Sequence, residues 1–217
     1  MKRLTISTIA LIMTFSFVPV QAQSVNRNFL VIGQSNGLYV CPYLQAKAEI
    51  AFPNDNVTVI CSAVGSTHIA EWQEGAPRGL YEDMLDDVDG RSIDLIVIWQ
   101  GEEDAMIESD AKGHRFFMVE LILDLREDIG ASVPIIIMNL GLDPYNDLSL
   151  GPYRWTVYAC IETFNGINGI PTFYRVKVLQ TFRIQSDPNS PPHKTPSGYR
   201  VASSNIISKY KNMIGLP

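Results

Sequence analysis

Five short apolar runs constrain the fold of this chain more than any other feature of its sequence. Each run is rich in Val, Ile or aromatic residues and is bounded by turn-forming residues. The runs are Phe29–Ile32, Val57–Cys61, Leu95–Trp99, Ile135–Met138 and Phe173–Leu179. Continuous apolar runs of this length are typical of strands that are buried on both faces. The sequence therefore predicts five buried strands.

The longer segments between these runs show helical spacing. Leu38 to Ala51 contains few helix breakers, and in two later segments apolar residues recur every three to four positions: Met118, Leu121, Ile122, Leu125 and Ile129, and then Tyr199, Ala202, Ile206, Tyr210 and Met213. Such spacing predicts amphipathic helices. Strands that alternate with helices form a parallel sheet covered on both faces, so we expect an α/β protein with three layers, α/β/α. In such folds, ligands bind beyond the carboxyl ends of the strands.

The first 22 residues have the pattern of a signal peptide. Lys2 and Arg3 precede an apolar stretch from Leu4 to Val18, and Val20-Gln21-Ala22 fits a cleavage site after Ala22. We expect residues 23–217 to form one domain. Because no cysteine follows the cleavage site to carry a lipid anchor, we expect this domain to be secreted or periplasmic. No later stretch reaches the roughly 18 apolar residues of a membrane span, so stable membrane insertion is not expected.

Charge and cysteine content exclude several classes of protein. After cleavage the chain carries 15 basic and 23 acidic residues, a formal charge of −8, which argues against nucleic acid as a partner. Three cysteines, Cys41, Cys61 and Cys160, are too few and too scattered for a disulfide framework or a zinc site. We expect buried free thiols. If one bridge forms, we expect it between Cys41 and Cys61.

A serine stands where the first strand meets the first helix. The turn Gly33-Gln34-Ser35-Asn36-Gly37 follows the run Phe29–Ile32 directly. Its glycines permit a tight turn, and the N-terminus of the next helix offers unpaired N–H groups. One alternative is that Ser35 or Asn36 only caps the helix. The turn also fits the G-x-S-x-G elbow of α/β-hydrolases, but only about a dozen mature residues precede it, too few for that fold's upstream oxyanion loop.

Four segments, each following a predicted strand or preceding the last helix, resemble the conserved blocks of one enzyme superfamily. They are Gly33-Gln34-Ser35-Asn36, Ala63 to Trp72 (AVGSTHIAEW), Trp99 to Asp104 (WQGEED), and His193 with Gly198-Tyr199. In this order they resemble the SGNH hydrolase superfamily, and within it the sialate O-acetylesterase and acetylxylan esterase branch, carbohydrate esterase family six. The resemblance implies a flavodoxin-like sheet of five parallel strands and a serine esterase.

A nucleophilic serine needs a base close to its hydroxyl. Of the three histidines, His193 stands where the family's base is found, in a loop before a helix. His114 lies at the polar start of a predicted helix, and we expect it to be a solvated surface residue. His68 lies near the rim of the site, where it contacts substrate or satisfies a local backbone group; we favour the second interpretation.

The oxyanion of the tetrahedral intermediate needs fixed hydrogen-bond donors. We expect one from the backbone N–H of Ser35. The resemblance implies two more, the backbone N–H of Gly65 and the side-chain amide of Gln100. Without the family comparison, Gly65 is an ordinary turn glycine and Gln100 a polar residue at a strand end.

The third member of the triad departs from the family pattern. The family usually has an aspartate three residues before the histidine, but that position is Ser190 in this chain. A serine cannot balance the charge of an imidazolium as a carboxylate does. Three hypotheses remain: Asp187 orients His193, Glu102 orients it, or the site is a weakened dyad or inactive.

The expected reaction is ester hydrolysis through an acyl-enzyme on Ser35 with His193 as base, and it requires neither a metal nor a cofactor. The resemblance implies that the substrate is an acetylated glycan. Trp72, Tyr39, Trp155 and Tyr145 offer aromatic surface to a sugar, or pack in the core. Alternatives are a catalytically impaired domain that binds glycan or protein, and an esterase for lipids or simple esters. The sequence leaves the oligomeric state open.

Overall fold

A computed structural model describes residues 24–140, 175–179, 187 and 193–216. The predicted signal peptide, Ser190 and three further residues of the sequence analysis, Tyr145, Trp155 and Cys160, lie outside the described residues. Among the helices of this described part, none is long and apolar enough to cross a membrane.

The core of the structure is a parallel sheet of five strands in the order β2-β1-β3-β4-β5, which confirms the predicted architecture. The strands are β1 (Asn26–Gly33), β2 (Asn56–Cys61), β3 (Leu95–Trp99), β4 (Ile135–Met138) and β5 (Val176–Leu179). β3 and β4 have the predicted bounds. β1 begins three residues before the predicted strand, because its polar start at Asn26 still pairs with Asn56 of β2.

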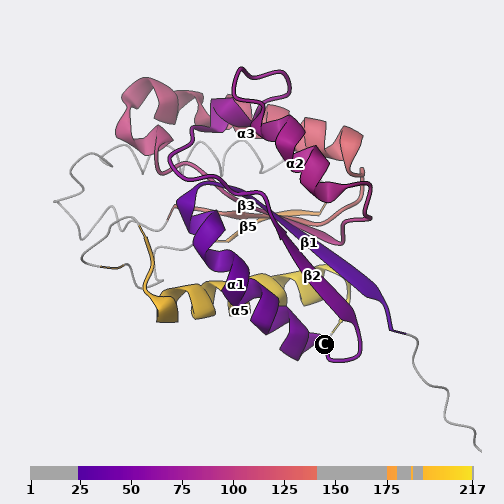
Figure 1. The fold of residues 1–217 in the computed structure, drawn as a ribbon. Helices are drawn as coiled ribbons and strands as arrows, with labels where there is room; N and C mark the ends of the chain where they lie inside the picture. Colours follow the sequence, from indigo (N-terminus) through magenta and orange to yellow (C-terminus); the bar gives the residue numbers. More distant parts are fainter. Residues whose placement is uncertain (1–23, 141–174, 180–186, 188–192, 217) are drawn as a thin grey trace, which may run out of the picture.

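Helices cover both faces of the sheet (Figure 1). α1 (Ser35–Ala51) and α5 (Pro196–Met213) lie on one face, and α2 (Leu80–Val88) and α3 (Glu108–Asp128) lie on the other. Two single-turn 3₁₀ helices, η1 (Ile69–Trp72) and η2 (Asp104–Met106), follow β2 and β3. α2 was not among the predicted helices.

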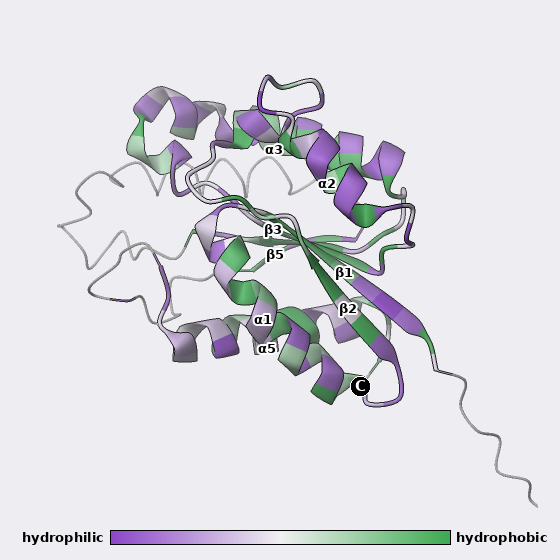
Figure 2. Ribbon diagram, viewed as in Figure 1, coloured by the Kyte–Doolittle hydropathy of each residue, from purple (hydrophilic) through white to green (hydrophobic). Residues whose placement is uncertain are grey.

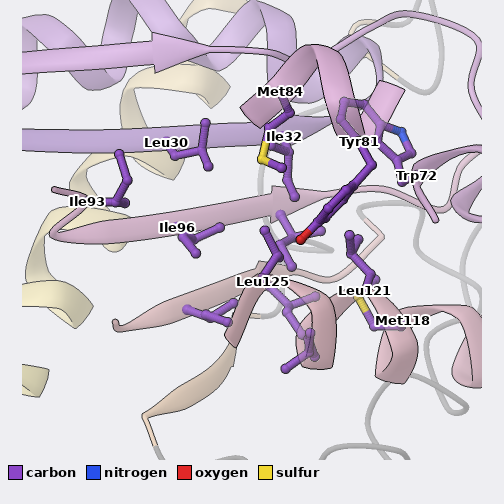
Figure 3. Close-up of a cluster of buried hydrophobic side chains, with 14 of the residues drawn as sticks. Leu30, Ile32, Trp72, Tyr81, Met84, Ile93, Ile96, Met118, Leu121 and Leu125 are labelled. Atoms are coloured by element: carbon purple, nitrogen blue, oxygen red, sulfur yellow. The ribbon is translucent and has the colours of Figure 1, made fainter. Parts of the chain in front are cut away.

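The strands supply two separate cores, because alternate side chains point to opposite faces of a sheet. Leu30 and Ile32 of β1 pack with Ile96 of β3 against α2 and α3, as Figure 3 shows. Phe29 and Val31 face α1 and α5 instead. In Figure 2 the inner strands are accordingly hydrophobic, whereas the helices are hydrophilic on much of their outer surface. A strand buried on both faces has no polar side, which explains the continuous apolar runs in the sequence.

A disulfide bond links Cys41 of α1 to Cys61 at the end of β2, with 6.1 Å between the two Cα atoms. The expectation of free thiols is therefore wrong for these two residues, and the pairing is the one expected if a bridge formed. α1 packs back across β1 and β2, and this brings its second turn to the carboxyl end of β2.

Candidate active site

Three segments meet at the carboxyl ends of the central strands. The backbone N–H of Gln34 donates to the carbonyl oxygen of Trp99 at 2.9 Å, and that of Val64 donates to the oxygen of Gly33 at 2.8 Å. Gly33 has a φ of +118°, and a Cβ there would lie 2.1 Å from the oxygen of Trp99. Only glycine fits this position, and it allows the ends of β1, β2 and β3 to converge.

Ser35 is the first residue of α1, so the chain turns from strand to helix at the hydroxyl group. The N-cap is Gln34, and its side chain makes no capping hydrogen bond. The capping interpretation of Ser35 and Asn36 is therefore wrong. The first N–H groups of a helix have no acceptor within the helix, and the helix dipole places positive potential there.

His193 lies against Ser35, although the two residues are 158 positions apart in the chain. Nε2 of His193 is 2.9 Å from Oγ of Ser35. His193 precedes α5, whose N-terminus is fixed by the Thr195 hydroxyl, which accepts a hydrogen bond from the N–H of Gly198 at 3.1 Å. The ring of Tyr39 packs edge-on against the imidazole at a centroid distance of 5.0 Å. This is the geometry of a serine and its general base.

Asp187 and Glu102, the two carboxylates proposed to orient His193, occupy different surroundings. The backbone N–H of Asp187 donates to the carbonyl oxygen of His193 at 2.8 Å, and both residues line one cavity. Glu102 lies on the sheet side of the serine turn and is 1% exposed. The structure thus places Asp187 directly beside the His193 segment and Glu102 beside the turn that carries Ser35.

The Glu102 carboxylate binds the residues on either side of Ser35. Oε2 accepts a hydrogen bond from the side-chain amide of Gln34, and Oε1 accepts from Nδ2 of Asn36 at 2.6 Å. The indole N–H of Trp99 also donates to Oε1, at 3.0 Å. Hydrogen bonds to a buried carboxylate are charge-assisted and strong, so Glu102 fixes the turn that carries Ser35.

Tyr199 connects the Ser35 and His193 segments. Its hydroxyl donates to Oδ1 of Asn36 at 2.8 Å and accepts from the backbone N–H of Lys194 at 3.2 Å. Burial raises the pKa of Tyr199 and keeps its hydroxyl protonated. The neighbour of Ser35 is thus joined to the neighbour of His193 through one side chain. The sequence marked Tyr199 only as part of a block and of a helix face; its hydroxyl contacts depend on the tertiary structure.

The two further oxyanion donors of the sequence analysis lie beside the serine turn. A Cβ built on Gly65 would be 4.0 Å from Cβ of Ser35, so this backbone passes close to the nucleophile. Gln100 is 2% exposed, and its amide nitrogen donates to the carbonyl oxygen of Thr67 and, at 3.3 Å, to Asp104. Both amide hydrogens of Gln100 therefore already have acceptors in the protein. Of the two candidates, we consider Gly65 the better placed oxyanion donor.

A buried carboxylate, Asp104, holds the segment after β3. Nδ1 of His114 lies 3.3 Å from one oxygen, Nδ1 of His68 lies 3.7 Å from the other, and the N–H of Ile69 donates at 3.1 Å. The expectation that His114 is a solvated surface residue is wrong, since it is 1% exposed. Its ring packs against Gly101, where a Cβ would lie 2.9 Å from Cε1 of His114.

Electrostatics explain why this carboxylate is stable inside the protein. Burial alone would raise the pKa of Asp104, but interactions with His114, His68 and the N–H of Ile69 lower it well below its usual range. In turn, the nearby carboxylate of Asp104 raises the pKa of His68, whose ring is 35% exposed at the rim and also lies 3.4 Å from Asp110. His68 thus lies beside two carboxylates and, as the N-cap of η1, takes part in a capping box with Glu71. Among the described residues, no cluster of His, Cys, Asp and Glu side chains has the arrangement of a metal site.

Two aromatic residues considered for sugar binding differ in exposure. Trp72 is 1% exposed and donates its indole N–H to Thr67 at 3.2 Å, so it belongs to the core. Tyr39 is 48% exposed beside His193. Of these two, only Tyr39 can present a ring face to a ligand.

Comparison with protein families shows which class of enzyme this chain belongs to. Residues 39–156 match the family described as carbohydrate esterase, sialic acid-specific acetylesterase, and this match covers more than half of the chain. The chain belongs to this carbohydrate esterase family. It is therefore a carboxylic ester hydrolase, and the resemblance to SGNH hydrolases is confirmed. The matched segment contains Gly65, Gln100 and Glu102, whereas Ser35 and His193 lie outside it and depend on the geometry above.

Solved structures show that this carbohydrate esterase has the SGNH fold. A protein from Arabidopsis thaliana is similar over 87% of this chain and 99% of its own, with a TM-score of 0.64 and 16% identity. A carbohydrate acetylesterase from Xanthomonas citri matches 86% of this chain and 56% of its own (TM-score 0.66, 13% identity). Axe2, an acetylxylan esterase from Geobacillus stearothermophilus, matches 91% and 98% (TM-score 0.59, 12% identity). A search by sequence among curated proteins found no match.

Proposed function

We propose that this carbohydrate esterase is an exported O-acetylesterase that removes acetyl groups from sugar hydroxyls through an acyl-enzyme on Ser35. The observation that carries the proposal is the 2.9 Å contact between Oγ of Ser35 and Nε2 of His193 at the carboxyl edge of the sheet. The acetylesterase family and its carbohydrate-directed structural neighbours support the substrate class.

In the first half of the reaction, Oγ of Ser35 attacks the acetyl carbonyl carbon while Nε2 of His193 takes the hydroxyl proton. The backbone N–H groups of Ser35 and Gly65 stabilise the oxyanion. The bond from carbon to the sugar oxygen then breaks, His193 returns the proton to that oxygen, and acetyl-Ser35 remains. In the second half, water attacks acetyl-Ser35 with His193 as base, and acetate leaves with regeneration of the serine.

We assign the orientation of His193 to Asp187. The hydrogen bond from the Asp187 N–H to the His193 carbonyl oxygen holds the two residues together. Glu102 is already the acceptor for Gln34, Asn36 and Trp99, so its carboxylate serves the nucleophile turn. Gln100 is assigned to the support of the Thr67 loop, and it reaches the oxyanion only if one of its two amide hydrogen bonds opens.

Export is supported by two observations. The first 22 residues have the signal-peptide pattern, and the disulfide between Cys41 and Cys61 suits an oxidising compartment. We propose that residues 23–217 form one mature domain.

The decisive test compares purified mature protein with its Ser35→Ala variant on 4-nitrophenyl acetate and on acetylated oligosaccharides, with release of nitrophenol and acetate as the readouts. Ser208→Ala, at an exposed serine of α5, is the matched control and should keep the wild-type rate. Ser35→Ala should reduce turnover to background. A wild-type rate equal to that of Ser35→Ala would refute the proposal and favour an impaired binding domain.

Asp187→Asn separates the remaining hypotheses for the triad. Loss of the orienting carboxylate should lower kcat by about 10⁴, the scale known for serine triads. A change of less than threefold in both Asp187→Asn and Glu102→Gln would instead indicate a Ser35–His193 dyad.

A further inference from the structure

A cavity of about 460 Å³ lies beside His193, between the N-terminal halves of α1 and α5. Its walls are mostly aromatic or apolar, and they come from Leu38, Tyr39, Pro42, Tyr43, Pro196 and Tyr199. Three polar residues complete the lining: Asp187, His193 and Lys194. A few polar groups in a largely apolar wall, at this volume, are typical of sites for small ligands.

The cavity extends away from the nucleophile along one face of α1. Ser35, Tyr39 and Tyr43 are spaced four residues apart, so they lie one above the other on the helix surface. Tyr43 is stacked on Tyr199 at 5.7 Å with an interplanar angle of 19°, which makes it a fixed wall. The ring of Tyr39 contacts His193 at 5.0 Å and Tyr199 at 6.0 Å between ring centroids, and Tyr39 keeps 48% of its surface exposed.

We propose that this cavity is a sugar-binding subsite, in which one sugar ring of an acetylated oligosaccharide stacks on the exposed face of Tyr39. This inference rests on the proposed function, because it places the sugar next to the ester that Ser35 attacks. A pyranose ring has an apolar C–H face and a rim of hydroxyl groups. The C–H face of the sugar matches the ring of Tyr39, and its hydroxyl groups need hydrogen-bond donors and acceptors at the edge of the cavity.

The charged residues favour a sugar over a fatty acyl chain. Asp187, His193 and Lys194 make one part of the wall polar, whereas a site for an acyl chain needs a wall that is apolar throughout. An alkyl chain against the same wall would displace water from its polar part and give no hydrogen bond in return. The cavity is therefore matched to a polar ligand with one apolar face.

The test compares kcat/KM for acetylated xylotetraose and 9-O-acetylated sialyllactose with kcat/KM for 4-nitrophenyl acetate, which has no sugar. In Tyr39→Ala the ratio for the better sugar substrate should fall about tenfold, the equivalent of one aromatic stacking interaction. Tyr39→Phe should restore the ratio. Phe116→Ala removes an aromatic residue that is 61% exposed on α3, on the opposite face, and should leave the ratio unchanged.

A binding measurement keeps the inference testable without turnover. Calorimetry with the same two sugars should detect binding to Ser35→Ala and a loss of about tenfold in affinity when Tyr39→Ala is added. Unchanged ratio and affinity in Tyr39→Ala would overturn the subsite. A preference for 4-nitrophenyl octanoate that depends on Tyr39 would also overturn it and assign the cavity to an acyl chain. If no ester is cleaved faster than by Ser35→Ala, the proposed function fails, and calorimetry alone decides the subsite.

Discussion

Replacement of Glu102 by glutamine tests the assignment of the two carboxylates most directly. The wild-type carboxylate is 1% exposed and accepts hydrogen bonds from Gln34, Asn36 and Trp99. In Glu102→Gln an NH₂ group replaces one of the two carboxylate oxygens. This NH₂ group cannot accept a hydrogen bond from the donor that it faces. Gln34 can turn its own amide to present oxygen, but its nitrogen then loses its partner inside the protein.

The size of the effect follows from these three bonds. A hydrogen bond to a charged group contributes about 1.5–3 kcal/mol and one between neutral groups about 1 kcal/mol, so three bonds that lose their charge should cost about 3 kcal/mol. For a domain of this length, each kcal/mol lowers Tm by about 2–4 °C. Glu102→Gln should therefore unfold roughly 6–12 °C below the wild type in a thermal melt followed by circular dichroism.

Activity measured well below Tm completes this experiment. Glu102→Gln should lower kcat about tenfold through displacement of Ser35, whereas Asp187→Asn should keep the wild-type Tm within about 2 °C and lose about 10⁴ in kcat. The reasoning is refuted if the two variants exchange these behaviours, with Glu102→Gln folding normally and losing the larger factor. That result would make Glu102 the residue that orients His193.

Three further predictions concern the turn, the link between segments and a buried lysine. Gly33→Ala places a Cβ against the oxygen of Trp99 and should abolish soluble expression or lower Tm by more than 10 °C. Gly75→Ala is the control: Gly75 has a φ of +71° but open space around it, so a urea titration should find a free energy of unfolding lower by only about 1 kcal/mol. Tyr199→Phe keeps the ring contacts but loses two hydrogen bonds, so kcat for 4-nitrophenyl acetate should fall about tenfold with KM unchanged. Burial lowers the pKa of Lys194 to about 8, below its value in the unfolded chain. Above pH 8 the unfolded chain therefore binds more protons than the folded protein, and the free energy of unfolding should rise between pH 8 and 9.5. Urea titrations should find this rise in the wild type and not in Lys194→Gln.

Local patterns in the sequence predict the sheet of this protein well. β3 and β4 were predicted at their observed bounds, because a strand buried on both faces leaves a continuous apolar run. α2 was missed because it has only nine residues and four of them are acidic, although Leu80, Tyr81, Met84 and Val88 form its buried face. A short helix is stabilised by packing rather than by its own propensity, so a single sequence gives a weak signal for it.

The environment of each polar side chain was not predictable in the same way. His114 follows acidic and polar residues that indicate a surface, yet it is buried against Gly101 and Asp104. Cys41 and Cys61 have no local feature that distinguishes a thiol from a disulfide. In each case the partner comes from a distant segment, and only the packing of α1, α3 and the strand ends determines which groups meet.

By itself, the sequence determined the alternation of buried strands and helices and the position of Ser35 at the end of the first strand, since these follow from apolar periodicity and from a short motif. The family resemblance added His193 as the expected base. Only the tertiary structure decided how the surroundings of the two carboxylates differ. Glu102 and Asp187 are chemically alike, but convergence of the strand ends surrounds Glu102 with three donors, whereas the backbone N–H of Asp187 donates to the carbonyl oxygen of His193.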